Sequence, residues 1–152
     1  MPATQLDEDE LRLWGTVLAL WRVLGTGMER QLARAGSSGA DYQVLVTLAE
    51  APGRAARPRD IGIELGWDRS RVSHQLRRME QRGLVSRTQV DDDARGTMVA
   101  LTSGGLRSLR SAAPGHVAWV RENFLSQVTE EEARVLTEVG RRVVGRLQQP
   151  DA

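Results

Sequence analysis

The order of structural signals between residues 58 and 101 constrains this chain more than any other feature of its sequence. Pro58 suits the first turn of a short helix, and Gly66 suits its end. Asp68 is then expected to cap a second helix, which Gly83 ends. The apolar residues of that second helix recur at helical spacing and are Val72, Leu76 and Met79. The pattern therefore predicts two helices joined by a tight turn.

The segment after Gly83 predicts two strands. Residues 84–88 and 97–101 alternate between apolar and polar side chains, and a polar loop separates them. A hairpin directly after two helices joined by a tight turn is the order of a winged helix, a fold in which the second helix can enter the major groove of DNA. The predicted fold class is therefore mainly α (α+β), a winged helix-turn-helix with a two-stranded β-wing.

Positive charge is concentrated in the same part of the chain. All 21 basic residues are arginine, yet the formal net charge of the whole chain is only +1. Residues 54–90 carry nine arginines against four acidic residues, whereas residues 1–53 carry four against seven. Arginine binds phosphate and guanine well, and the middle segment is therefore predicted to be the anion-binding surface.

The helix capped by Asp68 has an entirely polar face opposite its apolar stripe. Such a face is either an ordinary solvated surface or a nucleic-acid interface, because its side chains can donate to bases or phosphates. The helix-turn-helix order favours the second interpretation. The residues of this helix predicted to contact DNA are Arg69, Ser70, Arg71, Ser73, His74, Gln75, Arg77 and Arg78.

The hairpin loop adds Asp93 and Arg95 to the predicted DNA-binding residues. Arg95 precedes Gly96 at a tip that otherwise carries mostly acidic residues, and an arginine at such a tip can enter the minor groove. A salt bridge between Asp93 and Arg95 within the turn is the alternative role. Both roles hold if the carboxylate orients the guanidinium.

Both ends of the chain predict long amphipathic helices. Over residues 7–35, apolar or small residues form one helical seam, and Gly36 is a plausible stop. Near the other end, Thr129 and Glu132 have the spacing of a capping box before a second apolar stripe. A narrow core cannot cover both stripes, and so a second copy is expected to cover them. The chain is therefore predicted to be a homodimer.

These patterns divide the chain into two expected domains. Residues 1–36 and 103–152 are assigned to a helical dimerisation domain, and residues 37–102 to the winged helix-turn-helix domain. Within the first of these, Pro114-Gly115 interrupts the apolar spacing of a helix that begins near Ser103, and a kink is predicted there.

The stretch from Trp67 to Gly105 resembles the MarR family of bacterial transcription regulators, because its consecutive motifs occur in the order that is typical of that family. The resemblance implies symmetric winged helices that bind pseudo-palindromic double-stranded DNA, and a first helix that joins the last two in the dimer. It also implies a regulator, expected to be a repressor, that a small molecule releases. Three residues depart from the pattern of the family, namely His74 in place of arginine, Gly62 in place of alanine and Ala94 in place of a basic wing residue.

Members of the family bind small aromatic or amphipathic effectors between their dimerisation and DNA-binding parts. Trp14, Trp21, Tyr42 and Trp119 are the candidates for such a cleft here, with core packing as the alternative role. Trp67 is instead expected to wedge the DNA-recognition helix against the helix before it. No ligand role is expected for Trp67.

Other functions receive less support. A chain without cysteine and with only two histidines, 42 residues apart, predicts no metal site, no cofactor and no catalytic residue. A hydrolase that uses His74 with Ser70 or Ser73 would need a base oriented in a pocket, whereas these residues belong to an outer face. A winged-helix protein-interaction module without DNA binding is the stronger alternative. With no membrane span and no signal peptide, the chain is expected to be cytoplasmic.

Overall fold

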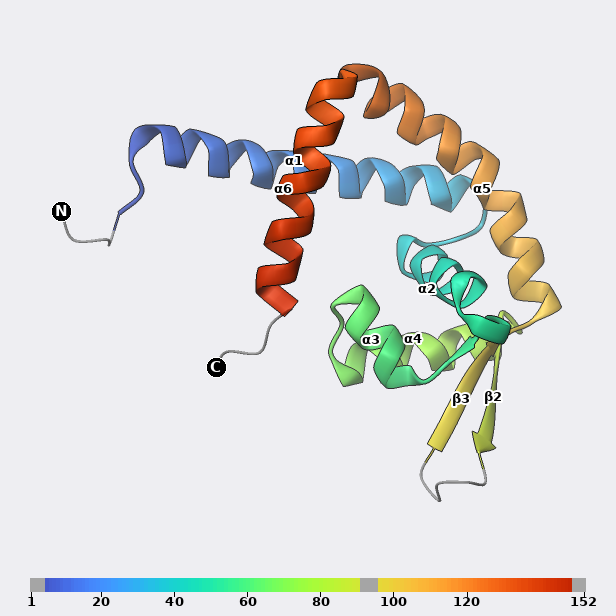
Figure 1. The fold of residues 1–152 in the computed structure, drawn as a ribbon. Helices are drawn as coiled ribbons and strands as arrows, with labels where there is room; N and C mark the ends of the chain where they lie inside the picture. Colours follow the sequence, from blue (N-terminus) through green and yellow to red (C-terminus); the bar gives the residue numbers. More distant parts are fainter. Residues whose placement is uncertain (1–4, 91–95, 149–152) are drawn as a thin grey trace. The chain divides into compact units, whose positions relative to one another are not determined.

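The computed structural model describes residues 5–90 and 96–148 (Figure 1). Its elements are α1 (Glu8–Arg34), α2 (Gly39–Glu50), η1 (Pro52–Arg54), β1 (Ala55–Ala56), α3 (Pro58–Leu65), α4 (Arg69–Gln81), β2 (Val85–Val90), β3 (Gly96–Leu101), α5 (Ser103–Asn123), η2 (Leu125–Gln127) and α6 (Glu130–Gln148). The chain divides into two compact units, Met1–His116 and Val117–Ala152, with the boundary inside α5. The predicted fold class, a mainly α winged helix-turn-helix, is confirmed.

The two central helices begin and end where their capping residues predict. Asp68 caps α4, because its carboxylate accepts a hydrogen bond of 2.9 Å from the backbone nitrogen of Arg71. Gly66 and Gly83 follow α3 and α4 with φ angles of 63° and 69°, in the left-handed region that glycine enters without strain. The connection between α3 and α4 is therefore the tight turn of a helix-turn-helix.

Hydrogen bonds within the first turn of α2, and one to α1, hold the start of α2 in place. Ser38 and Asp41 form a reciprocal capping box. The carboxylate of Glu29 in α1 accepts a hydrogen bond of 2.8 Å from the backbone nitrogen of Gly39. A Cβ atom on Gly39 would lie 2.6 Å from that same carboxylate oxygen, and so a glycine permits the contact.

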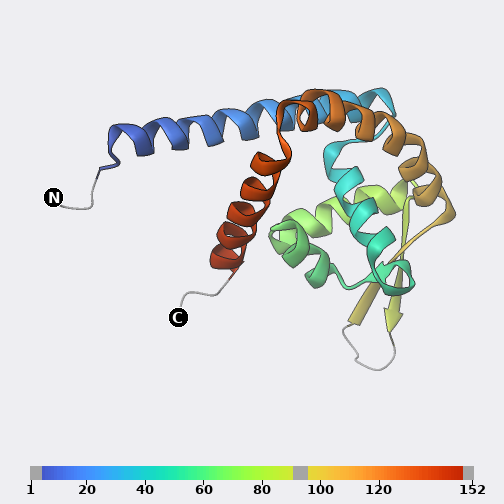
Figure 2. The same ribbon diagram turned by 45° about the horizontal axis from the view of Figure 1, so that its top comes forward.

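The wing has one strand more than predicted. Ala55–Ala56 pairs antiparallel with residues 99–100 of β3, and β2 pairs with β3 over the full length of both strands. The sheet therefore has three strands in the order β1-β3-β2. A strand of two residues is too short to show the alternation that reveals strands in a sequence. Figure 2 shows the hairpin of β2 and β3 projecting beyond α2, α3 and α4.

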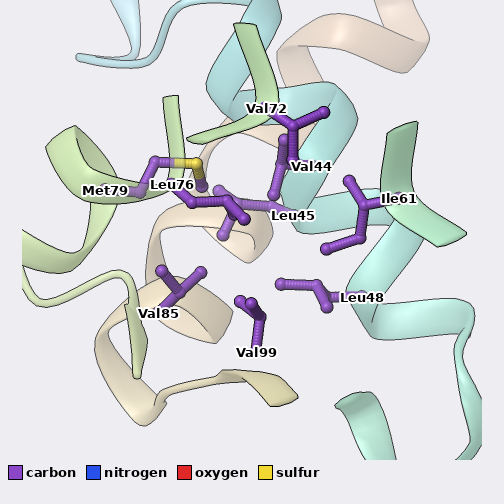
Figure 3. Packing of buried hydrophobic residues seen from close by; sticks show 9 residues of the cluster. All are labelled: Val44, Leu45, Leu48, Ile61, Val72, Leu76, Met79, Val85 and Val99. Carbon is purple, nitrogen blue, oxygen red and sulfur yellow. The ribbon is translucent and has the colours of Figure 1, made fainter. Parts of the chain in front are cut away.

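One apolar core joins α2, α3, α4 and the sheet (Figure 3). Its buried residues are Val44, Leu45, Leu48, Ile61, Val72, Leu76, Met79, Val85 and Val99. The predicted stripe of α4 is thus confirmed as its buried face. Trp67 and Leu109 are among the partly buried residues packed against this core. The core fixes α4 against the base of the wing.

The end of α4, the start of β2 and the start of α5 meet at Thr102. Its hydroxyl donates toward the carbonyl oxygens of Gly83 and Leu84, at 2.6 and 2.9 Å, and accepts a hydrogen bond of 3.0 Å from the backbone nitrogen of Gly105. A Cβ atom on Gly105 would lie only 2.1 Å from the carbonyl oxygen of Leu84, and one on Gly104 would lie 2.8 Å from that of Gly83. The paired glycines therefore allow this close approach.

α5 runs as one helix from Ser103 to Asn123 with Pro114 inside it, and so the helix continues through the position of the predicted kink. Proline removes one backbone donor from a helix interior, which is why the sequence predicts a kink there. The boundary between the two compact units follows shortly afterwards, between His116 and Val117.

Among the described helices, none combines the length and apolar character that a membrane span needs.

Candidate nucleic-acid interface

α4 presents a polar outer face to solvent. Seven of the eight side chains predicted there are exposed, namely Arg69, Ser70, Arg71, Ser73, His74, Arg77 and Arg78. The first turn of α4, which the structure describes in full, carries no acidic side chain. The face therefore offers cations and neutral hydrogen-bond donors without a carboxylate that would repel phosphate in that turn.

Gln75 is the exception and corrects the expected placement. Its residue surface is only 8% exposed, and its amide nitrogen donates a hydrogen bond of 2.6 Å to Asp41 of α2. Gln75 follows Val72 by three residues and precedes Leu76, and so it lies at the edge of the buried stripe rather than opposite it. Its side chain is committed to the interior of the protein and is not placed to meet DNA.

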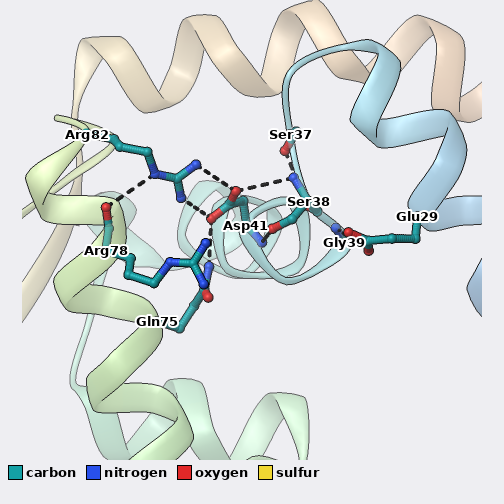
Figure 4. A network of polar contacts seen from close by, with 8 residues as sticks. All are labelled: Glu29, Ser37, Ser38, Gly39, Asp41, Gln75, Arg78 and Arg82. Atoms are coloured by element: carbon teal, nitrogen blue, oxygen red, sulfur yellow. Dashed lines mark hydrogen bonds and ion pairs between the residues drawn. The ribbon is translucent and has the colours of Figure 1, made fainter.

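Arg82, which the sequence reasoning missed, completes the cluster around Asp41 (Figure 4). One terminal guanidinium nitrogen lies 3.0 Å from the Asp41 carboxylate, and the other terminal nitrogen also donates to it. Asp41 is only 2% exposed. Burial raises the pKa of this carboxyl, but hydrogen bonds from Arg82 and Ser38 lower it by more, and so the pKa lies below its ordinary value of 3.8. The cluster holds the start of α2 against α4.

The Arg71 guanidinium lies over the Trp67 ring at the start of α4. The guanidinium carbon of Arg71 lies 4.2 Å from the centroid of the Trp67 ring. This is the geometry of a cation–π contact. Arg71 is thereby the one predicted DNA-binding side chain for which the described residues show an aromatic partner.

A basic cleft runs between α3, α4 and the wing. Its volume is about 820 Å³, and its charged and hydroxyl-bearing lining residues are Arg57, Arg59, Asp60, Arg69, Ser73, Arg87 and Thr97. Arg57, Arg59 and Arg87 were not among the predicted site residues, although the positive charge of residues 54–90 was the signal that could have found them. Arg87 forms an ion pair of 2.6 Å with Glu80, which ties β2 to α4. The cleft extends the positive surface from α4 toward the wing.

The predicted wing residues, Asp93 and Arg95, lie outside the described residues. The strands on either side are described, and their last pair is Val90 with Gly96. Within the described residues, no group of three histidine or acidic side chains is placed to hold a metal ion.

The four aromatic candidates for an effector site are divided between the two compact units. Trp14 and Trp21 are 53% and 75% exposed on α1. Tyr42 of α2 packs against His116, which was not predicted, with ring centroids 4.7 Å apart. Trp119 belongs to the second compact unit. Burial lowers the pKa of His116, and its buried Nδ1 has no hydrogen-bond partner among the described residues.

The part of the chain that contains α4 and the cleft matches a known family. The model of the MarR family matches residues 35–96. The solved structure of Sco3205, a MarR family transcriptional regulator from Streptomyces coelicolor in complex with DNA, is 36% identical, has a TM-score of 0.93 and covers 97% of this chain and 94% of its own. AbsC, a MarR family transcriptional regulator from the same organism, is 34% identical, with a TM-score of 0.91 and coverage of 96% and 99%.

A further relative is known as a repressor. The transcriptional repressor MprA of Escherichia coli (strain K12) is 24% identical over 120 residues, which are 79% of this chain and 68% of MprA. The two Streptomyces structures match nearly the whole chain, and so the similarity is not confined to the residues that the family model covers. By sequence and by fold, the chain belongs to the MarR family of transcriptional regulators.

Proposed function

We propose that this protein regulates transcription by binding double-stranded DNA, with α4 in the major groove. The observation that carries the proposal is the outer face of α4, where seven exposed polar or basic side chains lie beside the cleft lined by arginines. Arginine, serine and histidine at the start of such a helix can donate to base edges and phosphates. The relative Sco3205 has been solved in complex with DNA, which supports DNA binding as the function proposed for this chain.

The wing completes the proposed interface. β2 and β3 bring residues 90 and 96 side by side, and so the segment between them, with Asp93 and Arg95, follows directly from the end of the hairpin. An arginine there would enter the minor groove while α4 occupies the major groove. Repression is the proposed outcome of binding, as in the relative MprA.

Dimerisation is proposed for residues 1–36 and 103–152, leaving residues 37–102 as the DNA-binding domain. Large apolar side chains remain exposed along α1, among them Leu11, Trp14, Leu18 and Trp21. Those exposed along α6 are Val135, Leu136, Val139, Val143, Val144 and Leu147. Isolated apolar side chains are common at surfaces, but continuous stripes of this kind mark an interface. A two-fold dimer would present two copies of α4 to a pseudo-palindromic site.

An effector site is the remaining part of the proposal. Trp14, Trp21, Tyr42 and Trp119 are proposed to contact a small aromatic or amphipathic molecule that releases the DNA. Tyr42 contacts His116 with the two ring planes tilted by 54°, and the buried Nδ1 of His116 has no partner among the described residues. Both observations support the part of this site around Tyr42.

Selection from a random DNA pool, followed by binding measurements, tests the function. The full-length protein is expected to enrich a pseudo-palindromic duplex and to bind it less tightly as salt rises, because counterions are released. Arg77→Ala should weaken binding, whereas Arg107→Ala, which removes an exposed arginine from α5, should not. A protein that binds no duplex at any salt concentration would instead support the protein-interaction module.

Light scattering tests the dimer separately. The protein should have twice the chain mass at micromolar concentration, and a truncation without residues 1–34 and 129–152 should be monomeric. A monomeric full-length chain, or a truncated chain that stays dimeric, would contradict the proposed assembly.

A further inference from the structure

Trp67, the residue before the capping residue Asp68 of α4, is held in place by its backbone and by the apolar core. The backbone nitrogen of Trp67 donates a hydrogen bond of 2.8 Å to the carbonyl oxygen of Gly62, and the side chain packs against the apolar core. A Cβ atom on Gly62 would lie 3.0 Å from the carbonyl oxygen of Trp67 and 3.2 Å from a methyl group of Val72. The glycine at position 62 thus allows α3 to approach the turn closely. Trp67 is therefore fixed by its backbone and by its packing.

Arg71, in the first turn of α4, places its guanidinium over the Trp67 ring. Its guanidinium carbon lies 4.2 Å from the centroid of the Trp67 ring, and Arg71 is exposed. Among the described residues, no hydrogen bond or ion pair occupies its guanidinium nitrogens. A guanidinium that stacks through its face keeps the N–H groups at its edge available for a phosphate or for guanine O6 and N7.

We propose that Trp67 is a positioning residue for DNA recognition, which holds the Arg71 guanidinium in the orientation in which Arg71 contacts DNA. The inference rests on the proposed function, because it concerns how α4 reads DNA. A free arginine side chain loses much rotamer freedom when it is immobilised on a ligand. Contact with Trp67 restricts the rotamers of Arg71 in the free protein. Less side-chain entropy is therefore lost when Arg71 binds DNA.

The same helix contains unstacked arginines for comparison. Arg69 and Arg77 are exposed on α4 like Arg71, but neither has an aromatic partner among the described residues. If Trp67 acts only as a wedge between α3 and α4, its loss should disturb every contact that α4 makes with DNA. If it acts through Arg71, its loss should matter only while Arg71 is present.

A double-mutant cycle on the 152-residue protein separates these two roles. The variants are Trp67→Leu, Arg71→Ala and the double variant, with Arg77→Ala in place of Arg71→Ala as the matched control pair. Binding to the selected duplex is measured by fluorescence anisotropy, and the thermal unfolding of every variant is recorded. Trp67→Leu is expected to weaken binding by about 3- to 10-fold in the wild-type background, which is the order of the entropy lost when one long side chain is immobilised at an interface.

The background decides the outcome. In the Arg71→Ala background, Trp67→Leu should change affinity by less than about 2-fold, whereas with Arg77→Ala its effect should stay as large as in the wild type. An equal loss in both arginine backgrounds, or no loss in the wild-type background, would overturn the inference. If the wild type binds no duplex, the proposed function itself fails, which is a different result.

A second variant keeps the test valid if Trp67→Leu unfolds. Trp67→Phe retains an aromatic ring and most of the packing, but the face of phenylalanine attracts a cation less strongly than that of tryptophan. Its loss of affinity should be smaller than that of Trp67→Leu and should again vanish with Arg71→Ala. A loss that persists in the Arg71→Ala background would overturn the inference in this variant too.

Discussion

Asp41, in the first turn of α2, accepts hydrogen bonds from both terminal guanidinium nitrogens of Arg82, at the end of α4. Arg82→Gln should leave a buried carboxylate with fewer partners and lower the free energy of unfolding by about 1–2 kcal/mol, because the arginine is itself partly exposed to water. Urea unfolding measures the effect. Arg78→Gln, at an exposed position of the same helix, is the matched control and should change stability little.

The pH dependence of the same pair follows from the lowered pKa of Asp41. A carboxyl whose pKa is lower in the folded protein stabilises the fold at pH values above its unfolded pKa, and this contribution is lost as the pH falls through the folded value. The stability difference between wild type and Arg82→Gln should therefore be constant from about pH 5 to 7 and shrink below about pH 4. A difference that instead grows as the pH is lowered would contradict the assignment.

Gly105→Ala should be strongly destabilising. The added Cβ atom would lie 2.1 Å from the carbonyl oxygen of Leu84, which is backbone and cannot rotate away. Overpacking of this kind costs about 1–3 kcal/mol or more, and calorimetry should show a clearly lowered Tm. Ser103→Ala, at an exposed position of the same helical turn, serves as control, and an equal effect of both substitutions would rule out the steric explanation.

His74→Ala tests the contribution of His74 to DNA binding. His74 is exposed on α4, where its ring nitrogens can form hydrogen bonds with bases or phosphates. Affinity for the selected duplex should fall by about 3- to 10-fold, because one such hydrogen bond contributes about 1 kcal/mol. Fluorescence anisotropy measures the effect, and an unchanged affinity would remove His74 from the interface.

Arg95→Ala tests the wing. If Arg95 makes one contact of the phosphate type, the substitution should weaken binding and reduce the slope of log affinity against log salt by about one ion. Titrations at four or more salt concentrations give the slope. Unchanged affinity with an unchanged slope would show that Arg95 lies outside the interface.

Local signals predicted most of the fold. The cap at Asp68 and the glycines at 66 and 83 act within one helical turn, and so a sequence reveals them without knowledge of the tertiary structure. The exposed face of α4 follows from the same helical periodicity. β1 escaped because its two alanines become a strand only through pairing with β3.

The polar cluster around Asp41 could not be predicted in the same way. Gln75 and Arg82 are polar residues in or next to a helix with a polar outer face, and nothing in their immediate neighbourhood distinguishes them from side chains that contact only solvent. Their common partner, Asp41, lies 34 and 41 residues away. Only the packing of α2 against α4 brings the three together, and tertiary packing of this kind has no local periodicity.

The hydroxyl of Thr102 has a mechanical consequence. It connects Gly83 and Leu84, which lie between α4 and β2, to the first turn of α5 through bonds of 2.6 to 3.0 Å. Hydrogen bonds of this length tolerate only small displacements before they break. A shift of the first turn of α5 that leaves these bonds intact must therefore also move Gly83 and Leu84, and with them the connection between α4 and the sheet.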